Sequence, residues 1–187
     1  MEHKGYRVPP LSRKEIEIRT NNIRRILGFE NVLYFDIVQF LEWDVPKIIH
    51  GFELIPVGND ELDSDFARAY PDQNLIYVRE EVYVNAYERK GRDRLILAHE
   101  FSHCFLHKGI SPDYAKNYPG ILKKYESSEW QATVMAAQLL APTYLVKYLS
   151  VGQIMNMCGI SESAAQTQLS VANDNKLQHA ISRNLAF

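Results

Sequence analysis

Residues 93–108 read DRLILAHEFSHCFLHK, and this pattern predicts the helix around which the rest of the fold is built. Apolar residues flank a polar centre on both sides, at Leu95–Ala98 before it and at Phe101–Leu106 after it. Asp93 is a suitable capping residue at the start, and Gly109 is a stop signal after the last turn. Because most of this helix is apolar, we expect it to be buried and its polar residues to have partners.

His99, Glu100 and His103 form an HExxH pentapeptide in the centre of this helix. Residues four apart lie on one helix face, so the two imidazoles can share one zinc ion. Glu100 is turned by about 100° from His99 and can reach a water beside such an ion. A pattern with three fixed positions also recurs by chance on solvated surface helices. The apolar flanks favour the metal site, because unpaired polar groups are costly in a core.

A catalytic zinc site needs a third protein ligand besides the two histidines, together with one open position. His107 is not suitable, because it lies about 12 Å along the helix axis from His99. His107 is better placed to support a ligand, to face the substrate or to cap the helix. The third ligand is therefore expected from a second helix.

The segment SSEWQATVMAAQLLAP, residues 127–142, is the best candidate for that second helix. Ser128 and Gln131 predict a capping box, and the alanines allow close packing against the HExxH helix. Glu129 lies in the first turn and Glu126 just before it, so both are candidates for the third ligand. The alternative role for Glu129 is a favourable interaction with the helix dipole.

Three segments together resemble the ImmA/IrrE family of metallopeptidases. RLILAHEFSHCFLH at residues 94–107 resembles the HExxH helix of the family, and EWQATVMAAQLLAP at residues 129–142 resembles its second signature. ARAYPDQNLIYV at residues 67–78 resembles the strands that precede the catalytic helix. The resemblance covers roughly residues 50–170 and implies a zinc metallo-endopeptidase, with Mn²⁺ as an alternative metal.

The resemblance also implies a role for each site residue. His99, His103 and Glu129 would be the metal ligands, in a gluzincin-like arrangement with a glutamate as the third ligand, and Glu100 would be the general base. The family often has Asn or Asp four residues after the ligand glutamate, whereas this chain has Thr133. A threonine hydroxyl can still orient a ligand histidine by a hydrogen bond.

The oxyanion of the reaction needs a hydrogen-bond donor besides the metal. His107, Tyr77, Tyr114, Tyr118 and Tyr125 are all candidates, and the sequence does not choose among them.

The resemblance implies a protein substrate, a helix-turn-helix repressor whose cleavage releases phage, mobile-element or stress genes. Two alternatives stay open. One is an antirepressor that binds its target without cutting it, and the other is a DNA-binding regulator with a structural zinc.

The remaining patterns predict an α+β, zincin-like fold with a small sheet of about three strands packed on helices. Helices are expected at residues 11–27, 31–42 and 80–90, and strands at residues 52–57, 66–70 and 74–79. The strand Leu75–Val78 is either an edge strand that holds an extended substrate or a core strand.

Residues 1–150 are expected to form the metallopeptidase domain, and residues 151–187 a helical tail packed on it as one compact unit. Gly159 separates two predicted helices of the tail, which gives the outline of a helix-turn-helix. Residues 151–187 contain two cationic side chains, Lys176 and Arg183, and two anionic ones, Glu162 and Asp174. Phosphate contacts need more positive charge, so direct nucleic-acid binding is disfavoured.

The chain has 187 residues and a net charge of −2, which suits one domain and argues against a general nucleic-acid binder. It shows neither a signal-peptide pattern nor an apolar run long enough for a membrane span. Two cysteines are too few for a disulfide framework, so a cytoplasmic location is expected. The sequence makes no prediction about the oligomeric state.

Overall fold

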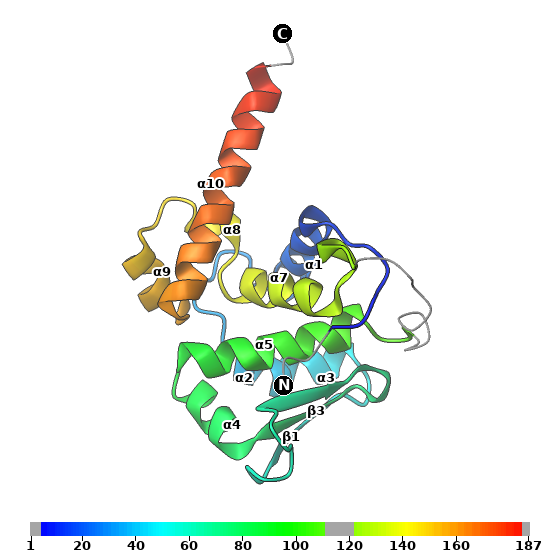
Figure 1. The fold of residues 1–187 in the computed structure, drawn as a ribbon. Helices are drawn as coiled ribbons and strands as arrows, with labels where there is room; N and C mark the ends of the chain where they lie inside the picture. The colour runs from blue at the N-terminus through cyan, green and yellow to red at the C-terminus, as the bar shows by residue number, and fades with distance from the viewer. Residues whose placement is uncertain (1–4, 111–121, 185–187) are drawn as a thin grey trace.

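The computed structural model describes residues 5–110 and 122–184, with the side chains of the last helix described up to residue 174. It is an α+β structure in which helices stack on a three-stranded sheet (Figure 1). In chain order the elements are α1 (Arg13–Ile26), α2 (Ile37–Gln39), a π-helical turn (Phe40–Asp44), α3 (Val45–Ile48), β1 (Glu53–Val57), β2 (Ala67–Tyr70), a 3₁₀ turn (Pro71–Gln73), β3 (Leu75–Arg79), α4 (Glu80–Tyr87), α5 (Gly91–Leu106), a 3₁₀ turn (Lys124–Glu126), α7 (Ser128–Leu140), α8 (Thr143–Val146), α9 (Val151–Cys158) and α10 (Glu162–Asn184).

The sheet has the strand order β1-β3-β2, with β3 in the centre. β1 runs parallel to β3 and β2 runs antiparallel to it, with Ala69 opposite Ile76. The segment Leu75–Val78 is therefore a core strand, which settles the alternative left open by the sequence. The two edges of the sheet belong to β1 and β2, and α5 packs against β2.

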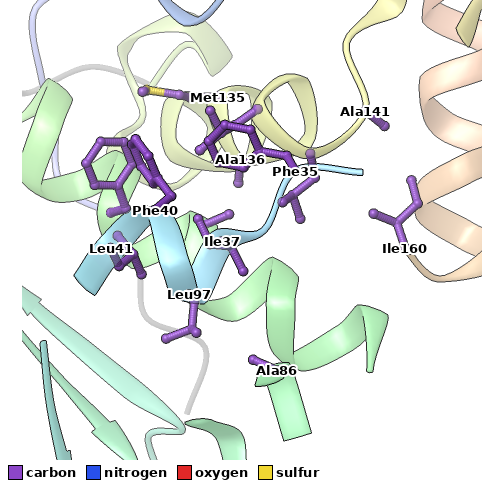
Figure 2. Packing of buried hydrophobic residues seen from close by; sticks show 14 of the residues in the cluster. Phe35, Ile37, Phe40, Leu41, Ala86, Leu97, Met135, Ala136, Ala141 and Ile160 are labelled. Atoms are coloured by element: carbon purple, nitrogen blue, oxygen red, sulfur yellow. The ribbon is translucent and has the colours of Figure 1, made fainter. Parts of the chain in front are cut away.

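Helix α5 lies between the sheet and α7, and α1 packs on α7 (Figure 1). Small side chains allow this close stacking, because Ala98 on α5 and Ala132 and Ala136 on α7 are fully buried. Leu97 and Met135 extend the same core toward the residues of α2, as Figure 2 shows. Burial of this apolar surface is the main force that holds the two helices together.

Three predicted helix starts are wrong. α5 begins at Gly91 with Lys90 in the cap position, so Asp93 lies inside the first turn and is not the cap. Local hydrogen bonds explain the other two. The helix expected at residues 31–42 begins only at Ile37, because the Asp36 side chain caps it by accepting from Gln39 N at 3.1 Å. The residues before it form turns and bends, and among residues 31–36 Phe35 is the one that is buried. The cap of α7 is Ser127, whose Oγ accepts from Trp130 N at 3.4 Å, whereas Ser128 Oγ accepts from Tyr6 N at 3.1 Å.

The first half of α10 packs on α8, α9 and α7 before the helix extends away from the body (Figure 1). The end of α9 contacts α5, because Arg94 donates to the Cys158 carbonyl. Gly159 adopts the left-handed conformation with φ 63° and ends α9. A Cβ on Gly91 would lie 2.7 Å from the Ile160 carbonyl carbon, so a glycine is needed where α5 begins against this turn. The division into a domain and a tail, and the helix-turn-helix assignment, stay predictions.

Among the helices of the described residues, none is both long enough and apolar enough to cross a membrane.

Candidate metal centre

His99, His103 and Glu129 bring three ligand atoms together between α5 and α7. The Nε2 atoms of the two histidines are 3.1 Å apart. Glu129 Oε2 lies 3.1 Å from His99 Nε2, and Glu129 Oε1 lies 3.4 Å from His103 Nε2. Among the described residues, His99, His103 and Glu129 form a group that could hold a metal ion. The stacking of α5 on α7 produces the cluster, since each helix alone supplies only part of it.

The spacing of these atoms fits a tetrahedral zinc ion. Ligand atoms about 2.0–2.1 Å from a tetrahedral centre are about 3.3 Å from one another. The two Nε2 atoms are 3.1 Å apart, close to that value, and each has one of the two Glu129 oxygens at 3.1 or 3.4 Å. Two imidazole nitrogens that face each other with their lone pairs repel, and a shared cation removes this repulsion. The donor set of two nitrogens and a carboxylate is one that zinc accepts.

The charge of Glu129 also suits a ligand. Burial by itself would raise the pKa of Glu129, but the neighbouring His103 and His99 side chains outweigh it and hold the pKa of that carboxyl well below its usual value. Glu129 is therefore ionised near neutral pH, as a ligand must be.

Glu126, the alternative candidate, points elsewhere. Arg7 Nη2 donates to Glu126 Oε1 at 2.8 Å and engages this carboxylate away from the cluster.

Glu100 lies beside the cluster and faces the edge of the sheet. Its Oε2 accepts a hydrogen bond from Ala69 N on β2 at 2.8 Å. Burial raises the pKa of Glu100, while the nearby His99 and His103 oppose that rise. A carboxyl whose proton affinity is increased by its surroundings is suited to accept a proton and return it.

His99 and His103 differ in how their outer nitrogens are held. Thr133 Oγ1 is 3.4 Å from His99 Nδ1, which is a long contact on the exposed side of α7. His103 Nδ1 lies 3.0 Å from His107 Nδ1, and His107 Nε2 lies 3.2 Å from Gln131 Oε1. Burial lowers the pKa of His107 to about 4, and the neighbouring His103 adds to this shift.

Sequence reasoning missed Tyr6. An extended arm, residues 5–11, brings Tyr6 against the cluster, and its ring centroid lies 6.0 Å from that of His107. Burial raises the pKa of Tyr6, and the negative charge of Glu129 adds to this shift. Nothing in the local sequence marks Tyr6, because its place depends on contacts with residues more than a hundred positions away.

Neither Tyr77 nor Tyr125 is among the described residues that line the hollow at the cluster. Tyr77 is on the central strand with its ring centroid 5.6 Å from that of Tyr70. Tyr125 is 41% exposed. Tyr114 and Tyr118 fall outside the described residues, so their role stays a prediction.

Two hollows flank the cluster along β2. One of about 280 Å³ contains His99, His103, Glu129 and Glu100, and Tyr6 forms part of its wall. The other, of about 510 Å³, adjoins His99 and Glu100, and its surface is mainly apolar, with Phe66, Leu95 and Ile96 in its wall beside the charged Asp65 and Arg92. The cluster therefore lies in an open groove that follows the free edge of the sheet.

Comparison with known families gives one match. The sequence model of Peptidase_M78, the IrrE N-terminal-like domain, matches residues 55–153. That is 99 of the 187 residues, and it includes the sheet from within β1 onward, α5 and α7. The search of curated proteins gives no match to this chain.

Proposed function

The chain belongs to the IrrE N-terminal-like family of metallopeptidases, and from this premise we propose that it is a zinc-dependent endopeptidase. His99, His103 and Glu129 would hold the metal, and Glu100 would be the general base. The observation that carries the proposal is the convergence of two imidazoles and a carboxylate: the Nε2 atoms of His99 and His103 are 3.1 Å apart, and an oxygen of Glu129 lies 3.1 to 3.4 Å from each.

A zinc ion at this site would supply the Lewis acidity that makes water a nucleophile near neutral pH. Glu100 would take the proton of the attacking water and return it to the leaving amine. The hydrogen bond from Ala69 N supports this role, because it holds one carboxylate oxygen toward β2 and leaves the other free to exchange the proton. Tyr6, in the wall of the same hollow, is a donor in reach of an extended substrate.

The free edge of β2 is the surface on which a substrate would bind. The Ala69 N–H points away from β3, since it bonds to Glu100, and so this side of β2 has no strand partner in the described sheet. An extended peptide adds to such an edge through main-chain hydrogen bonds. The apolar hollow beside Phe66 and Ile96 would then accept a large apolar side chain of the substrate.

The physiological substrate is proposed from the family resemblance to be a helix-turn-helix repressor in the cytoplasm, cleaved to release phage, mobile-element or stress genes. Both cysteines are free and buried, which is compatible with a reducing compartment.

The test is to incubate the chain with the candidate repressor and zinc or manganese, next to a Glu100→Gln variant. The variant keeps the size of the side chain and the three ligands, but a neutral amide cannot act as the general base. Wild type should cleave the repressor and Glu100→Gln should lose nearly all cleavage while it retains the metal. Repressor fragments are measured by mass spectrometry and derepression by a reporter.

Two outcomes would replace the proposal. If Glu100→Gln relieves repression as well as wild type, the chain works as an antirepressor by binding alone. If a His99→Ala variant keeps salt-dependent affinity for DNA and wild type cleaves nothing, the chain is a DNA-binding regulator with a structural metal.

A further inference from the structure

A buried line of polar groups leads from His103 away from the proposed metal. His103 Nδ1 is 3.0 Å from His107 Nδ1, and His107 Nε2 is 3.2 Å from Gln131 Oε1. Gln131 Nε2 then donates to Pro9 O at 2.9 Å and to Tyr125 O at 2.8 Å. His107 and Gln131 are each only 1% exposed, so water does not compete for these bonds.

The two carbonyls at the far end fix the direction of every hydrogen bond in this line. Carbonyl oxygens only accept, so the Gln131 amide nitrogen must face them and its oxygen must face His107. That oxygen also only accepts, so His107 carries its proton on Nε2. A neutral His107 then accepts at Nδ1, and His103 donates from its own Nδ1. His103 Nε2 is left with a lone pair that points at the cluster.

The arm that supplies one of these carbonyls is held firmly. Tyr6 N donates to Ser128 Oγ at 3.1 Å, Val8 N to Glu126 O at 2.9 Å, and Leu11 N to Tyr125 O at 3.0 Å. The arm lies before the region matched by the family, residues 55–153.

We propose that Gln131 and His107 are positioning residues, which use the fixed carbonyls of Pro9 and Tyr125 to set the tautomer and orientation of His103 as a metal ligand. The arm thereby becomes part of the metal site without touching the metal. This inference rests on the proposed metal centre.

The first ligand histidine has no comparable support. The contact of His99 Nδ1 with Thr133 is 3.4 Å long and lies on an exposed residue. His103 is thus the better oriented of the two. Removing the hydrogen bonds that orient it should lower the affinity of the site for metal. Removing such outer hydrogen bonds lowers metal affinity about 10–100-fold.

The experiment compares Gln131→Leu with Gln138→Leu in the full chain. Both glutamines lie on α7 and are 1% exposed, but Gln138 bonds to Asn21 and Thr143, away from the cluster. Both variants lose buried hydrogen bonds and should be destabilised to a similar degree. Zinc affinity, measured by competition with a chelator, should fall about 10–100-fold in Gln131→Leu and stay within about twofold in Gln138→Leu. Equal affinities in the two variants would overturn the proposal.

A second pair of variants tests His107 itself. His107→Leu removes the acceptor for His103 and should lower the zinc affinity by the same factor. His107→Gln restores an acceptor oxygen at similar reach and should recover part of the loss. A leucine variant as tight as the glutamine variant would contradict the role of the hydrogen bond.

The tautomer of His107 can be measured in the wild-type protein, so this test does not depend on the folding of a variant. Nitrogen NMR of the wild-type imidazoles should show one proton on His107, at Nε2, with and without zinc. A proton on Nδ1 would overturn the proposal even if the chain binds metal. Conversely, if the wild type binds no zinc, the proposed function is wrong. The His107 tautomer would still test the direction of the hydrogen bonds from His103 through His107 to Gln131.

Thermodynamic linkage between zinc binding and the order of the arm gives a further test. If the arm supports the metal site, zinc must in turn stabilise the arm. Hydrogen exchange of the Val8 and Leu11 amides should slow on zinc addition in wild type and slow less in Gln131→Leu. Equal slowing in both would mean that the effect passes only through Glu129 on α7.

Discussion

Arg94 is buried on α5, and its replacement by methionine should destabilise the whole chain. The side chain is 0% exposed, and its guanidinium donates to three backbone carbonyls, those of Cys158, Gly159 and Phe35. It also stacks over the ring of Tyr34 at 4.2 Å. Methionine fills much of the same volume but leaves the three carbonyls without a donor.

The size of the effect follows from those three carbonyls. Each buried carbonyl left without a donor costs at least about 1 kcal/mol, so Arg94→Met should lower the free energy of unfolding by about 3 kcal/mol. In a chain of this length that corresponds to a fall of about 6–12 °C in Tm. The matched control is Arg92→Met, because Arg92 is exposed and its guanidinium lies over the ring of Phe66, at 4.2 Å. An exposed cation–π contact contributes about 0.5–1 kcal/mol.

The assay is urea unfolding followed by two probes. Tryptophan fluorescence reports on the body through Trp43 and Trp130, and far-UV circular dichroism reports on all helices, α9 and α10 included. Coincident transitions would show that residues 151–187 unfold with the body as one unit. If Arg94→Met is as stable as wild type or more stable, burial of the cation outweighs its hydrogen bonds and the reasoning is refuted.

Three further predictions concern the site and its surroundings. Thr133→Asp should tighten zinc binding, because a carboxylate accepts from His99 Nδ1 more strongly than a hydroxyl; chelator competition measures this, with Thr133→Val as the control, and unchanged affinity would contradict it. Ile96→Trp should fill the apolar hollow and lower kcat/KM about tenfold or more for peptides with a large apolar residue, with the zinc content unchanged; an equal loss on peptides with only small side chains would count against a side-chain pocket. Arg7 holds the pKa of Glu126 below its ordinary 4.5 by a hydrogen bond, so this pair adds stability above that pH and loses it as the pH falls through the lower, folded-state pKa. Arg7→Gln should therefore destabilise the metal-free chain at about pH 7 and progressively less below about pH 4, as followed by urea unfolding; a difference that does not change with pH would argue against the ion pair.

The elements were largely predictable from local patterns. The 3.6-residue period of the apolar positions predicted α1, α5 and α7, and Gly159 predicted the end of α9. Errors arose where residues in an apolar run form turns and bends instead of a helix, as in the segment before Ile37. They also arose where a side chain was used elsewhere, as when Ser128 bonds to the arm instead of capping α7.

The sequence by itself determined that His99 and His103 share one helix face and that Glu129 lies in the first turn of a second helix, because both facts depend only on spacing within a helix. Only the tertiary structure decided that β2 is the edge strand beside the cluster, that Glu126 pairs with Arg7, and that Gln131 links His107 to the arm. These contacts join segments far apart in the chain. No local period encodes them, since they exist only when the stacking of α5 on α7 and the path of the arm have been fixed together.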